Sequence, residues 1–198
     1  MTLSDAQDWL SQVVWLDYKL AVALSVIAPL LLLGWAAVVR LQPLLALMII
    51  YWRVSSLLAV TVYLMIAEFP VSFMTGTAAR ALIPACLWFW DDLSQGILLA
   101  GGSLSRIFRW WRWLVTGYMG AGFLLSLGFL PCAFQQRLDA TCRIWLEPPL
   151  MFRQIFHPTI PVENLGLVGI LGLLAYVLYS LYFGWRLRRG DFDKYPEG

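Results

Sequence analysis

Two arginines stand in the middle of long apolar stretches, where a charged side chain must find a partner. Arg53 lies within residues 44–67 and Arg80 within residues 71–90, and each stretch is long enough to cross a bilayer as a helix. If the stretches form an antiparallel hairpin with Glu68 at its tip, both guanidinium groups lie roughly 13–15 Å from the same membrane face. A charge at that depth costs at least ~2.5 kcal/mol on insertion scales, so it must face a partner, water or protein.

The chain offers no obvious counter-ion for either arginine. By helix rise, Glu68 lies about 20 Å from Arg53, and Asp91 and Asp92 lie about 15 Å from Arg80. We therefore expect an anionic group from a lipid headgroup, a cofactor carboxylate or a neighbouring subunit to contact the arginines. The alternative is that both side chains extend to the cytoplasmic headgroups through thinned lipid.

Cys132 and Cys142 are ten positions apart in a segment rich in proline. We place this segment on the non-cytoplasmic side, where disulfides persist, and predict a bond between the two; two reduced thiols are the alternative. Cys86 stands within an apolar stretch and is expected to be an inert core residue. No histidine or further cysteine stands at ligand spacing, so we expect no metal site.

His157 is the single histidine of the chain. It is a possible ligand for a metal or pigment, although an isolated histidine more often has a structural role. The sequence contains no nucleophile–base set, no HExxH motif, no P-loop and no GxGxxG motif. We therefore expect a protein that is not an enzyme. No cofactor is identified, and lipid, chlorophyll and carotenoid stay open as bound molecules.

A basic-aromatic cluster precedes the fourth apolar stretch. We interpret it as a membrane-surface anchor to anionic lipid, with docking of a soluble partner as the alternative. The cluster consists of Arg106, Arg109, Trp110, Trp111, Arg112 and Trp113.

The elements that must position these residues are apolar helices. Of the 198 residues, 61% are hydrophobic and only 13% are charged, whereas a soluble domain carries about a quarter charged residues. In lipid, runs of this length satisfy their backbone as helices. The sequence thus predicts an all-α, polytopic integral membrane protein with a single membrane domain over residues 1–198. The expected elements are an interfacial helix at 1–19, membrane helices at about 20–39, 44–67, 71–90, 111–130 and 165–183, and a non-cytoplasmic loop at 131–164.

Details within these stretches predict local features. Pro29 removes an amide and frees the carbonyl of Ser25, which predicts a kink in the first membrane helix. Glycines recur at close spacing in residues 117–122 and 166–172, and such small residues let another helix approach closely. The short apolar piece at residues 97–100 is too brief to cross a membrane and is expected on the surface.

The distribution of basic residues predicts the orientation. With five spans, one side collects about twice as many basic residues as the other, and the positive-inside rule places that side in the cytoplasm, with the N-terminus outside and the C-terminus inside. The richer side holds Arg40, Arg106, Arg109, Arg112, Arg186, Arg188, Arg189 and Lys194, and the other holds Lys19, Arg137, Arg143 and Arg153.

Several short stretches between about residues 40 and 160 resemble a cyanobacterial family of small integral membrane proteins of unassigned function. The stretches are Tyr51–Leu64, Leu87–Leu93, Cys142–Pro149 and Phe156–Pro158. The resemblance implies a photosynthetic host and a thylakoid membrane location. It supplies no reaction and no ligand residues.

These observations predict an accessory or assembly factor that packs in the membrane against a larger photosynthetic complex. The arginines would meet acidic or pigment groups of that partner. The alternative function is a small transporter or channel in which Arg53 and Arg80 line an anion path. The lack of an inverted repeat argues against that alternative, because many transporters show such symmetry.

Overall fold

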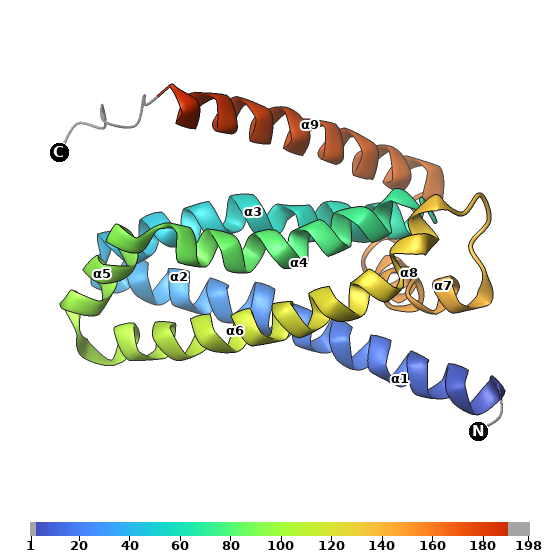
Figure 1. The fold of residues 1–198 in the computed structure, drawn as a ribbon, viewed down its shortest axis with the longest axis horizontal. Helices are drawn as coiled ribbons and strands as arrows, with labels where there is room; N and C mark the ends of the chain where they lie inside the picture. Colours follow the sequence, from blue (N-terminus) through green and yellow to red (C-terminus); the bar gives the residue numbers. More distant parts are fainter. Residues whose placement is uncertain (1–2, 190–198) are drawn as a thin grey trace.

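The computed structural model describes residues 3–189, and within them every regular element is a helix. The all-α prediction is therefore confirmed. Figure 1 shows an elongated bundle in which the long helices run back and forth along one axis. The elements are α1 (Leu3–Val22), the π-helix η1 (Ala23–Ile27), α2 (Ala28–Val39), α3 (Gln42–Ile66), α4 (Val71–Phe89), α5 (Asp91–Ala100), α6 (Gly102–Gly128), the 3-10 helix η2 (Leu130–Phe134), α7 (Ala140–Ile144), α8 (Glu147–Phe156) and α9 (Val162–Arg188).

Three helices of the described chain are long and apolar enough to cross a membrane. They are Gln7–Val39, Gln42–Ile66 and Val162–Arg186, and they correspond to the first, second and fifth predicted spans. The protein thus has the character of a helical membrane protein. The predicted spans at 71–90 and 111–130 coincide with α4 and most of α6, which are not among these three.

The N-terminal helix is longer than predicted. We expected a separate interfacial helix over residues 1–19, but α1 continues through η1 into α2 without a break. The helix persists because no proline or glycine lies between Leu3 and Val22, and the first proline, Pro29, stands in the first turn of α2. Residues 1–2 of the predicted segment lie outside the described residues.

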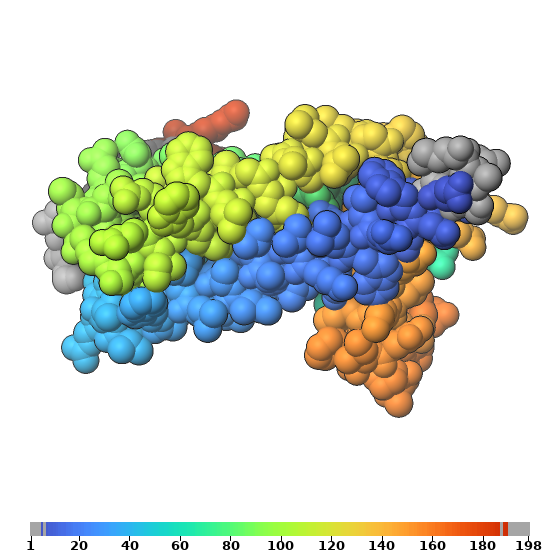
Figure 2. Space-filling view, turned by 90° about the horizontal axis from the view of Figure 1, so that it is seen from below, coloured from blue at the N-terminus to red at the C-terminus, as the bar shows by residue number. Residues whose placement is uncertain are grey.

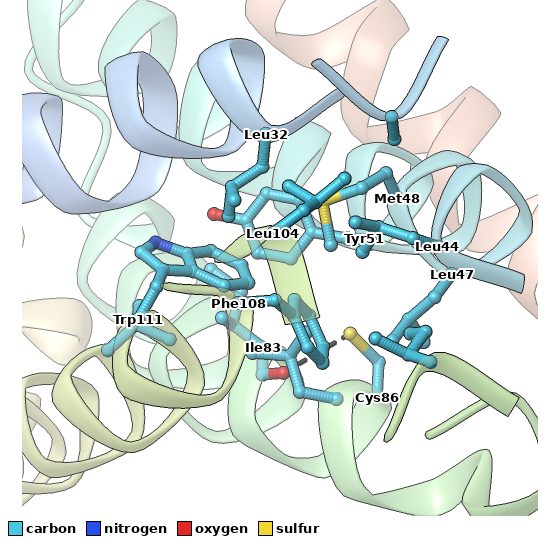
Figure 3. Close-up of a cluster of buried hydrophobic side chains, with 14 of the residues drawn as sticks. Leu32, Leu44, Leu47, Met48, Tyr51, Ile83, Cys86, Leu104, Phe108 and Trp111 are labelled. Atoms are coloured by element: carbon cyan, nitrogen blue, oxygen red, sulfur yellow. Dashed lines mark hydrogen bonds between the residues drawn. The ribbon is translucent and has the colours of Figure 1, made fainter. Parts of the chain in front are cut away.

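The π-helix forms where Pro29 removes a backbone donor. The carbonyl of Ser25 accepts a hydrogen bond from the Tyr51 hydroxyl at 2.7 Å, and the carbonyl of Leu24 accepts one from the Trp111 indole N–H at 2.9 Å. Aromatic side chains from α3 and α6 thus take the place of backbone amides that the ordinary helix would supply. Tyr51 and Trp111 meet edge to face, with ring centroids 5.4 Å apart, inside the main core (Figure 3).

Helix also extends into segments that were predicted to be irregular. The segment between the third and fourth predicted spans is α5 and the first turns of α6, joined at Gly101 and Gly102, which have positive φ values of 64° and 82°. The piece at residues 97–100 is not simply a surface segment, because Ile97 is fully buried in the main core while Leu99 is exposed. The predicted loop at 131–164 contains η2, α7 and α8.

The glycines of α9 pack against α3 within the same chain. A Cβ at Gly169 would approach the Leu64 amide nitrogen to 3.0 Å, and one at Gly172 would approach Val60 to 3.0 Å. The helix that these small residues allow to approach closely is therefore α3 of the same chain. In α6, by contrast, most of the glycines contact no neighbouring helix. Gly117 and Gly120 have no atom within 4 Å of an added Cβ.

Candidate functional site: a part-buried ion pair beside an apolar cavity

Arg80 has a counter-ion inside the chain. Its guanidinium group forms a two-bond ion pair with the carboxylate of Asp17, from Nη1 to Oδ1 at 3.1 Å and from Nη2 to Oδ2. The two side chains are only 12% and 14% exposed. The prediction that Arg80 needs an anion from outside the chain is therefore wrong. It failed because residues 1–19 were assigned to the membrane surface, whereas α1 continues into the bundle and carries Asp17 to α4.

The ion pair is enclosed by groups from α6 and from the segment before α8. The Tyr118 hydroxyl lies 2.9 Å from Asp17 Oδ1 and 2.8 Å from the Asp17 carbonyl oxygen, positions from which it donates to that residue. The Trp145 ring lies 5.9 Å from the Arg80 guanidinium carbon. Gly122 provides the space for the arginine, because an added Cβ would overlap Arg80 Nη1. Sequence reasoning missed Asp17 and Tyr118.

Arg53 lies on a different surface of the bundle. It is exposed, and its Nη1 donates a hydrogen bond to the Tyr179 hydroxyl of α9 at 3.0 Å. Its guanidinium carbon lies 5.9 Å from the centroid of the Tyr179 ring. Among the described residues no carboxylate lies within 4.0 Å of Arg53, so its charge is not neutralised within this part of the chain.

A cavity of about 480 Å³ lies between α1, α3, α4 and α8. Asp17 and Arg80 form part of its wall, but the rest is largely apolar. Seen from below, α1 crosses the molecule between the end of α6 and the projecting segment that contains α8 (Figure 2). Arg80 lines this cavity and Arg53 does not, so the two arginines do not share the path that the anion-channel alternative requires.

The cavity is lined mainly by α1, α3 and α4, with further residues from the end of α6 and the segment that follows it. The residues are Val14, Asp17, Tyr18, Ala21, Val22, Ser25 and Val26 of α1 and η1; Trp52, Ser55, Ser56, Leu58, Ala59, Thr61, Val62, Tyr63 and Met65 of α3; Phe73, Gly76, Thr77 and Arg80 of α4; and Ser126, Phe129, Trp145, Pro148, Pro149 and Phe152.

His157 contacts a residue of the cavity wall but does not itself line the cavity. Its Nε2 lies 3.1 Å from the Tyr63 hydroxyl, and its ring lies 5.9 Å from that of Phe152. Within the described residues no group of three or more His, Cys, Asp or Glu side chains is arranged to hold a metal ion. Through its contact with Tyr63, His157 joins the loop after α8 to α3.

Glu68 lies at the hairpin tip between α3 and α4, as its position in the sequence requires. Its φ of 54° allows the chain to reverse there, and its side chain is exposed. The structure does not bring it to either arginine: Arg80 pairs with Asp17, and Arg53 bonds Tyr179.

Cys132 and Cys142 lie at disulfide distance, with Cα atoms 6.0 Å apart, as predicted. Asp139 caps α7 by accepting a hydrogen bond from the Cys142 amide at 2.8 Å. That bond, together with one from the Gln135 side chain, lowers the pKa of Asp139. Cys86 is buried and free, as expected for a core residue.

The segment after the disulfide is tied to the N-terminal helix. Glu147 Oε2 accepts hydrogen bonds from Ser11 Oγ at 2.9 Å and from Trp15 Nε1 at 3.1 Å. Glu147 thus holds α8 against α1, next to the cavity.

The basic-aromatic cluster is divided between the surface and the interior. Trp110 and Trp113 are 72% and 59% exposed, and Arg106 and Arg109 are exposed. The surface-anchor prediction is wrong for the remaining two members, because Trp111 and Arg112 are 6% and 7% exposed. Consecutive residues of a helix point in different directions, so the six members of the cluster cannot all face lipid.

Arg112 is held inside the bundle by contacts with α4 and α5. Its Nη1 donates to Ser94 Oγ at 2.9 Å, and its guanidinium carbon lies 4.1 Å from the centroid of the Trp88 ring. Trp88 also meets Trp113, with centroids 4.7 Å apart. This arginine therefore stabilises packing and does not bind a headgroup.

Comparison with known proteins places the chain in a family without assigning a reaction. No curated protein and no solved structure matches the chain. The family model described as "Protein of unknown function (DUF3177)" matches residues 11–192, which include every residue that lines the cavity and both arginines. The chain therefore belongs to this family of proteins of unknown function.

Proposed function

We propose that the protein is a non-enzymatic accessory or assembly factor that packs in the membrane against a larger protein complex. The observation that carries this proposal is Arg53, an exposed cation at the middle of α3 that donates a hydrogen bond to a neutral hydroxyl, that of Tyr179. In lipid such a charge needs an acceptor, and Tyr179 supplies only part of the five-donor capacity of a guanidinium group. The partner would offer an acidic side chain or another oxygen acceptor at this depth.

The adjoining surface of α9 has the shape that a second helix requires. Its exposed apolar residues recur at alternating steps of four and three, which gives one continuous stripe. In a membrane such a stripe contributes by packing and not by the hydrophobic effect, so Arg53 would supply the directional contact. The stripe consists of Leu167, Leu171, Leu174, Leu178, Leu181 and Trp185, which are 49–67% exposed.

The proposal includes five membrane passes, with the N-terminus outside and the C-terminus in the cytoplasm. The alternating direction of α1–α2, α3, α4, α6 and α9 supports five passes. The cysteine pair supports an oxidising compartment for the segment between α6 and α9. A cyanobacterial thylakoid location and a photosynthetic complex as partner rest on the resemblance of residues 40–160 to such a family.

The test is association in native membranes. Membranes of the host are solubilised in a mild detergent, and complexes that contain the protein are separated on native gels and identified by mass spectrometry. We expect Arg53→Leu to insert normally but to reduce the complex-bound fraction by roughly three- to tenfold, as the loss of one strong interhelical hydrogen bond would.

Arg106→Leu is the matched control, since it removes an exposed arginine from the start of α6, away from α9. Equal complex-bound fractions for Arg53→Leu and wild type would contradict the proposal. Migration of the wild-type protein only as a free species, together with anion flux in liposomes, would favour the transporter alternative instead.

A further inference from the structure

Two arginines on the outer face of α6 have no ion-pair partner in the part of the chain that the structure describes. Arg106 and Arg109 are exposed, and no carboxylate of the described residues lies within 4.0 Å of either guanidinium group. They stand three positions apart on one helix, so their side chains are neighbours. Two positive charges side by side on an open surface favour an anionic ligand.

Two tryptophans lie next to these arginines on the same face of α6. Trp110 follows Arg106 by four positions and Trp113 follows Arg109 by four, so each ring lies about one turn nearer the middle of the helix. The two side chains are 72% and 59% exposed. Exposed tryptophans are typical of the membrane–water interface. The proposed passage of α6 through the membrane therefore places the arginines at headgroup depth.

Below the tryptophans the same face continues as an open apolar surface. Gly117 and Gly120 have no atom within 4 Å of an added Cβ, and Leu114 and Leu124 are 58% and 69% exposed. Figure 2 shows α6 open at the surface of the molecule. From Trp110 to Gly120 the helix rises about 15 Å, which is half of a hydrocarbon core of ~30 Å. One acyl chain of a single leaflet can therefore lie along this surface.

A second copy of the chain fits this face less well than a lipid does. Copies inserted in the same orientation would pack α6 against α6 with the arginines at the same depth, so the two arginine pairs would repel each other. A phospholipid instead brings phosphate oxygens, which a guanidinium group binds through two parallel hydrogen bonds. Basic residues at a membrane surface attract anionic lipid for the same electrostatic reason.

We propose that this face of α6 binds one anionic phospholipid. Its phosphate accepts hydrogen bonds from Arg106 and Arg109, its glycerol backbone lies beside Trp110 and Trp113, and one acyl chain follows the helix past Gly117. The proposal rests on the membrane passage of α6 and not on the protein partner, because α6 and α9 lie on opposite sides of the bundle (Figure 1). Lipid binding and partner association can therefore fail separately.

The experiment measures lipid binding by the purified full chain without any partner. The protein is delipidated in a mild detergent and titrated with phosphatidylglycerol or with phosphatidylcholine, and native mass spectrometry counts the lipids bound per chain. We expect about one phosphatidylglycerol per wild-type chain. The zwitterionic phosphatidylcholine should bind roughly tenfold more weakly or less, since it has no net charge for the arginines to neutralise.

Two double variants of equal net charge separate a defined site from general attraction. Arg106→Gln with Arg109→Gln removes both phosphate contacts and should weaken phosphatidylglycerol binding by roughly 10- to 30-fold. Arg188→Gln with Arg189→Gln removes two exposed arginines at the end of α9 and should bind like wild type. Arg106→Lys with Arg109→Lys should weaken binding only about two- to threefold, because lysine also binds phosphate as a point charge.

Thermal unfolding of every variant checks that the fold is retained. Equal phosphatidylglycerol affinity in the two glutamine double variants would overturn the proposal, as would equal wild-type affinity for the two lipids. Dimers of the wild-type protein that form through α6 and bind no lipid would overturn it in favour of a second copy. If Arg106→Gln with Arg109→Gln bound lipid normally but lost the native complex, the face would instead bind a protein.

Discussion

At the scale of single residues, the ion pair between Asp17 and Arg80 decides how α1 is held in the bundle. The carboxylate comes from the N-terminal helix, the guanidinium group from α4 and the supporting hydroxyl, Tyr118, from α6. A pair this well shielded contributes little compared with an apolar contact of the same shape, but the removal of one partner leaves an uncompensated charge. The main effect of the pair is therefore to fix the register of three helices, and its net contribution to the free energy of unfolding is small.

The first prediction concerns this pair. Asp17→Asn should lower the free energy of unfolding by on the order of 3 kcal/mol, because Arg80 would keep its charge without a carboxylate. Asp17→Asn combined with Arg80→Gln should recover much of the loss. Thermal unfolding of the two single variants and the double variant in detergent measures the coupling. Additive losses would show that the two side chains do not interact.

At the scale of elements, the π-helix shows how one proline shapes the contacts of three helices. Pro29 removes an amide, and the freed carbonyls of Leu24 and Ser25 are reached by Trp111 from α6 and Tyr51 from α3. The irregular turn thus joins the first helix to the main core, in which Tyr51 and Trp111 lie (Figure 3). It replaces the simple kink that the proline alone predicts.

Tyr51→Phe tests this account. The substitution keeps the buried ring but leaves the Ser25 carbonyl without a donor, which should cost about 1–3 kcal/mol of stability. Tyr182→Phe is the control, since it removes a hydroxyl from a residue that is 55% exposed on α9. If thermal unfolding shows the same midpoint for both variants, the hydroxyl does not stabilise the π-helix.

At the scale of the whole molecule, the segment between α6 and α9 closes one end of the bundle. The Cys132–Cys142 pair and the Asp139 cap order its first half, and Glu147 ties its second half to α1. The chain entropy removed by a loop of this length corresponds to roughly 2–3 kcal/mol. The disulfide should therefore stabilise this end of the bundle.

Thiol labelling tests the disulfide with an internal standard. The chain has three cysteines, and Cys86 is buried and free. In denaturant we expect one labelled thiol per chain before reduction and three after it. Three labelled thiols without reduction would contradict the bond. Cys132→Ser with Cys142→Ser should lower the unfolding midpoint, with Cys86→Ser as the matched substitution outside the loop.

The sequence by itself determined the helical membrane character, the hairpin at Glu68 and the cysteine pair. Each of these follows from local facts: the length of apolar runs, a short polar turn, and two thiols close along the chain. It also located the freed carbonyl of Ser25, because the effect of Pro29 on its own helix is local.

Only the tertiary structure decided which residues meet across helices. Asp17 reaches Arg80, and Trp111 and Arg112 turn inward, because the rotation and register of each helix are set by its neighbours and not by its composition. The cavity has the same origin, since it is formed jointly by four segments that are separated in the sequence. The position of a charged residue along its helix determines its depth in the membrane. Which residue it contacts depends on how the helices pack against one another.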